Sequence, residues 1–478
     1  MTPENRTIPP VASPARSACG LFVAAVLAAV LASPEAAVAA DSLPAGRAGN
    51  WQVLTRFSAS GSLRAAVAAP TPPDEETPPG ETATLEVVEH AVAVNATLQY
   101  VERPAEAAAS GMAGRTVERH YDRAEAVLQI DDTTVRTILP SDAEVVLITA
   151  ADGRLHPWLA DGFVTREERD LLALPFDPAW HAAVSPPAAA AAGTTWTLTT
   201  DGLAALLCID TVTGGEVTAT VKQAEADLLT VSLAGEVRGA VDGVPTVIDL
   251  SASYRWDASQ LSDTGLIGLE AQLHERRQAG HITPGLDIEA TVEITRRQAV
   301  AASDDSRQDP TTFATASRPP RRGPGQPGSL WLSDPHGRFD LVYDTRWRAI
   351  EQQTDQTVLR LIDEGRLLGQ ASIIPLPPTG DAPSLAAFQR DIERSLTGQF
   401  NHLVSAAESR RSDGTQILRV ASDGEADGLP FRWVHYHLTA ANGGQATLSF
   451  MVESGQLERF GEADQQLVDG FAVAGIAD

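Results

Sequence analysis

Two histidines near the C-terminal end of the chain have a spacing that could suit a metal ion. In His435-Tyr436-His437 the imidazoles are two residues apart, so in a strand they point to the same side of the sheet as Phe431 and Trp433. A metal site would need a third ligand, for which His402 is the nearby histidine candidate. Because the spacing fixes no third ligand, we interpret the pair as part of an aromatic, partly hydrated sheet face.

Carboxylates ahead of these histidines resemble the front of a calcium-binding loop. Asp423, Glu425 and Asp427 occupy alternate positions, and Gly428 stands where such a loop turns sharply. Val434 occupies the position of the closing bidentate ligand, which a calcium loop takes from a glutamate. We therefore interpret the segment as an acidic, solvated hairpin loop, with weak calcium binding by Asp423, Glu425 and Asp427 as the alternative.

The remaining motif-like strings lack a part that their chemistry requires. Gly323 to Gly328 spells G-x-G-x-x-G, but its two prolines remove backbone donors and no helix follows, so no dinucleotide is expected. His274-Glu275 begins like a zinc-protease motif, but no histidine lies four residues after His274. Lys222 is the sole lysine and follows no glycine-rich loop, which argues against Schiff-base and phosphate-loop chemistry. We predict no cofactor and no catalytic centre, although a glycosidase-type carboxylate pair leaves no local signature.

Residues 1–40 have the order of a secretory signal peptide. An apolar run over residues 21–32 is too short to span a bilayer, and the small residues up to Ala39 and Ala40 provide a cleavage site. No later segment has the length and hydropathy of a transmembrane helix. We therefore expect a bacterial protein that is exported to the periplasm or the medium.

The bulk composition narrows the classes of function further. The 478 residues are 43% hydrophobic, which is enough for folded cores in two or three domains. The formal net charge of −27 makes nucleic acid a poor partner, because an acidic chain repels phosphate backbones. Cys208 would be the lone cysteine of the exported chain, and its apolar neighbours predict a buried side chain.

Residues 41–300 are predicted to form a β-rich domain, because apolar residues recur at every second position. The alternation is clearest in a meander of about five antiparallel strands, in which Asp242-Gly243 is a two-residue hairpin signal. The domain divides into two strand-rich halves, 41–160 and 195–300. Between them, the capping-box pattern at Thr165 predicts the start of a short helix.

Such a sheet has few helices to cover its apolar face. We therefore expect strong curvature, towards a sandwich or a partial barrel. Several residues of the buried face are small. Small side chains there are compatible either with close packing or with a cavity for an apolar ligand. They are Ala219, Ala252, Ala271 and Ala290.

The pattern changes after a segment that lacks apolar residues. Residues 301–328 are rich in proline and polar side chains, so we predict a disordered linker. Residues 329–478 then combine strands with a helix that begins after Ser384 and carries apolar residues as far as Leu403. A closing helix carries apolar residues from Phe460 to Phe471. This order predicts an α+β module.

Aromatic residues in this module resemble those of the PsbP-like domain family. Phe339-x-Leu341-x-Tyr343-x-x-x-Trp347 is similar to the opening of such domains. The run from Leu429 to Trp433, followed by Gly443-Gly444 and Leu448-Ser449-Phe450, is similar to their later strands. The resemblance covers residues 330–473 and implies an α/β sandwich that serves in binding or assembly. It implies no catalytic residues, because the family shares no catalytic set.

Together these features predict an α+β multi-domain protein, in which an antiparallel β-rich domain is followed by a linker and a PsbP-like α/β sandwich. The expected function is that of an exported, non-enzymatic binding or assembly protein of the bacterial envelope. It would act through surface recognition of a protein partner or an apolar ligand. Two alternatives stay open: a carrier that holds an apolar ligand inside the curved sheet, and a hydrolase whose reactive groups meet only in three dimensions.

Overall fold

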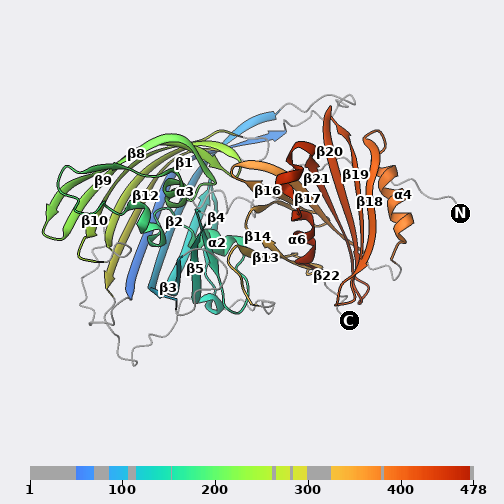
Figure 1. The fold of residues 1–478 in the computed structure, drawn as a ribbon, viewed down its shortest axis with the longest axis horizontal. Helices are drawn as coiled ribbons and strands as arrows, with labels where there is room; N and C mark the ends of the chain where they lie inside the picture. The colour runs from blue at the N-terminus through green and yellow to red at the C-terminus, as the bar shows by residue number, and fades with distance from the viewer. Residues whose placement is uncertain are drawn as a thin grey trace.

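The structure is a computed structural model that describes residues 50–68, 85–105, 115–151, 153–260, 265–279, 284–298, 324–377 and 382–473. It has a β-rich part, residues 50–298, and a C-terminal module, residues 324–473, which lie side by side (Figure 1). Strands account for 62% and helices for 14% of the described residues, in three antiparallel sheets. The predicted α+β class is therefore wrong. The chain is mostly β because its sheets extend through both parts, whereas the longest described helix has 11 residues.

Twelve strands of the β-rich part form one sheet. Its order is β6-β5-β3-β2-β1-β12-β11-β10-β9-β8-β7, with β4 paired to β3. The strands are β1 (Trp51–Ala68), β2 (Leu85–Pro104), β3 (Arg115–Ile130), β4 (Thr133–Ile138), β5 (Val145–Ala151), β6 (Arg154–Trp158), β7 (Thr195–Thr197), β8 (Thr211–Glu225), β9 (Leu228–Val241), β10 (Val244–Asp257), β11 (Leu266–Arg277) and β12 (Gly285–Gln298).

Strand β1 joins the two strand-rich halves that the sequence suggested. It pairs with β2 on one side and with β12 on the other, so that Trp51 lies opposite both Glu102 and Gln298. The alternation seen in the sequence determines which face of β1 is buried: its odd-numbered residues from Trp51 to Ala59 point into the core. The hairpin at Asp242-Gly243 is confirmed, with φ of 49° and 78°. The halves therefore share one sheet and one buried face.

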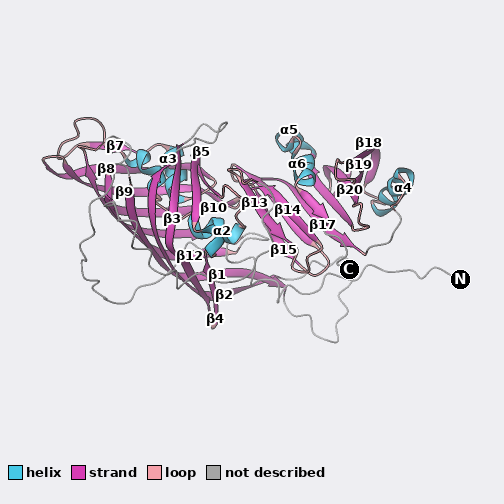
Figure 2. Cartoon of the chain, turned by 90° about the horizontal axis from the view of Figure 1, so that it is seen from below, coloured by secondary structure: helices cyan, strands magenta, loops and turns pink. Residues whose placement is uncertain are grey.

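Residues 159–210 cover the concave side of this sheet. Figure 2 shows the sheet bent into a trough with α2 (Arg166–Leu172) and α3 (Thr200–Leu207) on that side. The capping box at Thr165 is confirmed as the start of α2. The 3-10 helix η2 (Pro178–Val184) is fixed by the hydroxyl of Tyr254, which donates to the carbonyl of Val184 at 2.5 Å. The four alanines predicted on the buried face belong to the same packed cluster as this segment.

The C-terminal module contains a seven-stranded sheet and a three-stranded sheet. Figure 1 shows α4 on one face of the larger sheet and α6 on the other. The orders are β15-β16-β17-β21-β20-β19-β18 and β13-β14-β22. The elements are β13 (Ser329–Ser333), β14 (Phe339–Asp344), β15 (Trp347–Gln352), β16 (Thr357–Asp363), β17 (Arg366–Leu376), α4 (Leu385–Ser395), β18 (Phe400–Arg410), β19 (Gln416–Ala426), β20 (Leu429–Thr439), β21 (Gln445–Glu453), α5 (Leu457–Phe460), α6 (Ala463–Asp469) and β22 (Phe471–Val473).

Both predicted helices of this module are shorter than their apolar spacing suggested. Ser384 caps α4 as expected, but the helix ends at Ser395 and the chain enters β18. Gly398 lies between them with φ of 86°, a left-handed conformation that an α-helix cannot continue through. The closing helix is interrupted in the same way at Gly461, where φ is 54°. Among the described residues, no helix is both long and apolar enough to cross a membrane.

The two parts share one hydrophobic core. Buried apolar residues of both belong to a single cluster. An isolated parallel bridge joins Val164 to Leu330, and the amide of Trp331 donates to the carbonyl of Val164 at 2.9 Å. The cores of the two parts are therefore continuous at this contact, because the chain returns along the β-rich part before it enters the module. We call this contact region the seam.

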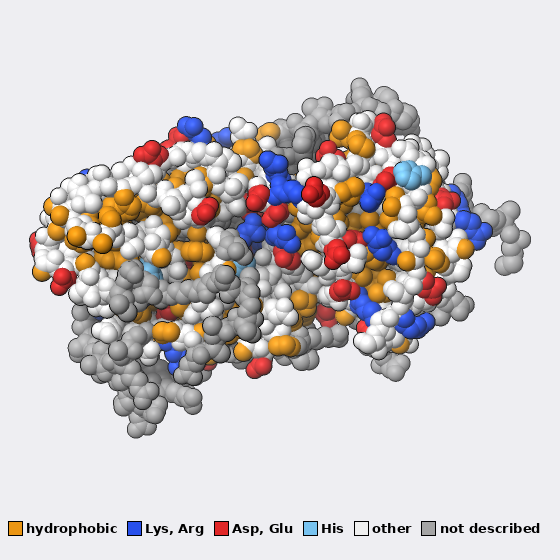
Figure 3. Space-filling model, in the orientation of Figure 1, with side chains coloured by type: hydrophobic (Ala, Val, Ile, Leu, Met, Phe, Trp, Pro, Cys, Tyr) orange, Lys and Arg blue, Asp and Glu red, His pale blue; other side chains and the backbone are white. Residues whose placement is uncertain are grey.

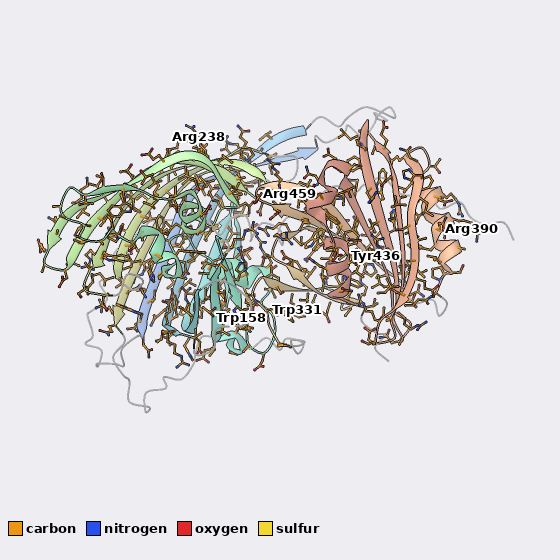
Figure 4. The ribbon with its side chains drawn as sticks, in the orientation of Figure 1. Trp158, Arg238, Trp331, Arg390, Tyr436 and Arg459 are labelled. Atoms are coloured by element: carbon orange, nitrogen blue, oxygen red, sulfur yellow. The ribbon has the colours of Figure 1, made fainter. Side chains whose placement is uncertain are left out.

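A second contact forms between two hairpin turns. Gly365 in the β16–β17 turn lies against Ala240 at the end of β9. The approach is so close that a Cβ atom added to Gly365 would lie only 2.8 Å from the Cβ atom of Ala240. Arg459 of α5 lies at the edge of the module that faces the β-rich part (Figure 4). Its Nη2 donates to Asp363 at 3.1 Å and to Glu364 at 2.8 Å, and so holds this turn. The seam is thus closed at two places.

Parts of the sequence interpretation lie outside the described residues. These are the signal peptide, with Ala39 and Ala40, and residues 301–323 of the predicted linker. The end of that linker is described, and the amide of Gly325 donates to the carbonyl of Ala160 at 3.4 Å. A Cβ atom at Gly325 would lie 2.0 Å from the carbonyl oxygen of Leu159, so glycine is required there by close packing. The domain boundaries themselves stay a prediction.

Candidate functional site

The predicted histidine pair lies on β20 beneath α4. His435 and His437 are both buried, and the ring centroid of His437 is 5.8 Å from that of Phe388 on α4. Nδ1 of His435 is 2.8 Å from the hydroxyl of Ser449 on β21. His402 is exposed on β18, where its Nε2 is 3.7 Å from the carboxylate of Asp423. The structure therefore does not bring the candidate third ligand, His402, to the pair.

Burial determines the chemistry of the two imidazoles. It lowers the pKa of His435 to about 4 and also lowers the pKa of His437, because a charged ring would lose water without gaining a counter-charge. In the described part of the chain, the Nε2 atoms of both rings have no hydrogen-bond partner. The pair is thus a neutral part of the aromatic sheet face.

The three predicted calcium ligands lie on the β19–β20 hairpin. Asp423 accepts from Nε of Arg432 at 2.7 Å and from its Nη2 at 2.9 Å, and these bonds lower the pKa of Asp423. Asp427 occupies a two-residue turn with φ of 51°, because the strands pair as far as Ala426 and Leu429. The loop is therefore much tighter than a calcium loop. No group of three or more metal-ligating side chains gathers within the described ranges, Asp423, Glu425 and Asp427 included.

Two other positions that the sequence singled out are also described. Cys208, predicted to be buried, is an exposed residue at the end of α3, where it has a left-handed conformation with φ of 55°, although its Sγ lies 3.9 Å from the carbonyl of Ala205 and burial raises the pKa of the thiol to about 12. His274, from the incomplete zinc-protease motif, bonds Asp287 at 2.9 Å and is half-exposed. Its neighbour Glu275 points the other way and is buried. Successive side chains of β11 thus alternate between the exposed face of the sheet and its buried face.

A charged pocket lies where the two parts meet, and no sequence motif predicted it. Its volume is about 100 Å³, and it is lined by α2, the end of α3, β11, the β5–β6 and β9–β10 turns and, from the C-terminal module, Thr345 and Arg348. We call it the seam pocket. On the face shown in Figure 3, basic and acidic side chains gather over this boundary. The charged lining residues are Arg154, Arg166, Arg169, Asp170, Asp210, Asp242, Glu275, Arg277 and Arg348.

Helix α2 supplies one side of the pocket. Its start at Thr165 places Arg166, Arg169 and Asp170 on one helix face, since they are three and four residues apart. Asp170 accepts from Nε of Arg166 at 2.6 Å and from Nη1 of Arg169 at 2.8 Å. Nη1 of Arg166 and Nε of Arg169 are buried and have no hydrogen-bond partner among the described residues. Burial, with the charges of Arg166 and Arg348, lowers the pKa of Arg169.

Arg348 brings the C-terminal module into the pocket. Its Nε donates to Oδ1 of Asp242 at 2.7 Å, and its Nη2 is 3.6 Å from Oδ1 of Asp210. Burial alone would raise the pKa of Asp242, but the charges of Arg348 and Arg166 outweigh it and lower that pKa to about 2. Burial raises the pKa of Asp210. One arginine from the module therefore holds two carboxylates of the β-rich part.

Arg277 closes the pocket from β11. Its side chain is 2% exposed, and its Nε and Nη2 donate to Glu275 at 3.1 and 2.5 Å. Its Nη1 is buried and finds no hydrogen-bond partner among the residues that the structure describes. The neighbouring Arg276 lies on the opposite face, where it is 47% exposed and donates to Asp249 at 2.8 Å.

This arrangement is suited to recognition. Every carboxylate that lines the pocket has an arginine beside it, and fixed charges in surroundings of low dielectric interact strongly with a polar ligand. A signal for the site was present in β11. Glu275 and Arg277 continue the inward-facing series of Leu269, Ala271 and Leu273, and charged residues at inward positions indicate a buried ionic site.

Comparisons with known proteins do not assign this chain to a family. No protein-family model matches the sequence, and no curated protein matches it either. The solution structure of cyanobacterial PsbP from Synechocystis sp. PCC 6803 is 14% identical and covers 31% of this chain and 93% of its own, with a TM-score of 0.25. The Saccharomyces cerevisiae Ran-binding protein Mog1p is 12% identical and covers 31% of this chain and 96% of its own, with a TM-score of 0.24. These scores are too low to carry an argument, so the PsbP-like assignment stays a prediction.

Proposed function

We propose that this chain is an exported binding protein of the bacterial envelope that recognises a polar ligand in the seam pocket and has no catalytic role. One observation carries the proposal: Arg348 of the C-terminal module and the charged side chains of α2, β11 and the β9–β10 turn line the same pocket. Export rests on the signal-peptide pattern of residues 1–40.

The pairing of charges supports binding in preference to catalysis. Asp242 and Asp170 each accept hydrogen bonds from arginine, so neither carboxylate is poised to take a proton from a substrate. We prefer the pocket to the inside of the curved sheet, because residues 159–210 pack against the concave face there. A ligand in the pocket would touch both parts and would stabilise their contact.

The test is a search for a small-molecule ligand. The full chain is equilibrated with a metabolite extract of bacterial cells, free compounds are removed, and retained compounds are identified by mass spectrometry. An Arg348→Met variant should lose the retained compound. The matched control is Arg346→Met, since Arg346 lies two residues away, pairs with Asp344 and is not part of the pocket lining. Equal retention by the Arg348→Met variant, or no retained compound with any variant, would contradict the proposal.

A further inference from the structure

We infer that the seam pocket binds a small oxyanion of the phosphate class through the side chains of Arg166, Arg169 and Arg277. This inference rests on the proposed function, because it names the ligand class of the same site. Its starting point is a set of buried donors that the protein leaves without acceptors.

The three donors are Nη1 of Arg166, Nε of Arg169 and Nη1 of Arg277, none of which has a hydrogen-bond partner in the described part of the chain. A buried N–H group without a partner is costly, so proteins rarely keep one that has no use. Arg277 is the most informative, because its side chain is 98% buried while the rest of its guanidinium is held by Glu275. All three arginines line the same pocket, so an oxygen-rich ligand bound there would meet guanidinium groups that still have an unused donor.

The charge of the pocket favours an anion. Its lining contains five arginines and four carboxylates, so cations are in excess even when every carboxylate is ionised. This excess is local, because the chain as a whole has a net charge of −27. The planar guanidinium group binds phosphate and carboxylate oxygens through paired N–H donors, which an ammonium group cannot do.

The size of the pocket limits the ligand. A volume of about 100 Å³ accommodates a small ion with its hydration water and is far below that of pockets for drug-sized molecules. A free phosphate ion and the phosphoryl group of a small ester have the same acceptor chemistry. Separate titrations with inorganic phosphate and glycerol 3-phosphate distinguish these two sources.

Isothermal titration of the full chain in chloride buffer tests the inference. Inorganic phosphate should bind the wild-type chain, and Arg277→Gln should weaken the binding about tenfold or more, since a hydrogen bond to a charged group is lost. Arg276→Gln is the matched control, because Arg276 is the neighbouring residue on the opposite face of β11. It should leave the affinity unchanged. The absence of phosphate binding, or equal weakening by both variants, would overturn the inference.

A second readout avoids substitution in the pocket. Cys208 lines the pocket, and burial raises the pKa of its thiol to about 12, so its alkylation by N-ethylmaleimide is slow and a bound anion should slow it further. The experiment uses the full chain with Cys19→Ser, which leaves Cys208 as the sole thiol. A labelling rate that saturating phosphate leaves unchanged would count against the site.

The outcomes of the two experiments separate the inference from the proposed function. If the extract yields an Arg348-dependent ligand that is not an oxyanion while phosphate does not bind, the inference is wrong and the proposed function stands. If the extract yields no Arg348-dependent ligand and phosphate does not bind, the inference and the proposed function are both wrong.

Discussion

Acidification from pH 7 to pH 5 should destabilise the protein through His435, and replacing this residue by leucine should remove that part of the loss. Burial lowers the pKa of His435 from 6.5 to about 4 in the folded state. The unfolded chain therefore takes up the proton first, and stability falls as the pH falls from about 6.5 towards about 4. The linkage relation gives a loss of about 2 kcal/mol at pH 5 and about 3 kcal/mol at pH 4.

The surroundings of His435 explain why the proton is refused. The residue is 9% exposed, and Nδ1 faces the hydroxyl of Ser449, which a neutral ring can bond. Val420 lies opposite His435 on β19 and packs in an apolar cluster with Phe388 of α4. Leucine has a similar size and cannot titrate, so His435→Leu removes the proton-binding step while Ser449, which is half-buried, keeps access to water.

Urea unfolding at pH 7 and at pH 5 measures the effect. Other groups titrate in both proteins, so the relevant quantity is the difference between wild type and His435→Leu in their loss of unfolding free energy. We expect about 2 kcal/mol less loss in the variant. His402→Leu serves as the control, because this side chain is 66% exposed, and it should lose as much stability as the wild type. If His435→Leu also loses as much as the wild type, the reasoning from burial is refuted.

Two further predictions concern the β-rich part. Arg119 is fully buried and bonds Asp177 through both terminal nitrogens, at 2.7 and 2.6 Å, and Glu102 through Nε at 3.0 Å. Arg119→Met should therefore lower the unfolding free energy by about 3–5 kcal/mol, because Asp177 would remain buried without its cation and Glu102 would keep Arg296, at 3.3 Å, but lose Arg119. The exposed Arg123 on the same strand provides the control, and similar losses from both arginines would show that the buried network is unimportant. Thr165→Ala should cost about 1 kcal/mol by removing the capping box of α2, and an unchanged urea midpoint would contradict that role.

Local patterns were enough to predict most individual elements. Alternation predicted the five strands of the meander, β8 to β12, and Asp242-Gly243 predicted a hairpin because its backbone conformation depends on two adjacent residues. Thr165 and Ser384 predicted helix starts for the same reason, since a cap bonds an amide three residues away. These predictions held because their physical causes lie within a few residues of one another.

The tertiary structure decided the fold class, the shared core and the site. The helix expected up to Leu403 ends early. Its apolar spacing fits one long helix as well as a short helix followed by a strand, and the left-handed conformation of Gly398 decides for the second arrangement. No single segment predicted the seam pocket, because four of its arginines come together only when the β-rich part folds, and the fifth, Arg348, arrives when the module packs against it. The sequence by itself determined where strands and turns lie, through short-range sterics and hydrogen bonds. Long-range contacts, within the β-rich part and across the seam, determined which charges meet, since no local rule relates residues so far apart in the chain.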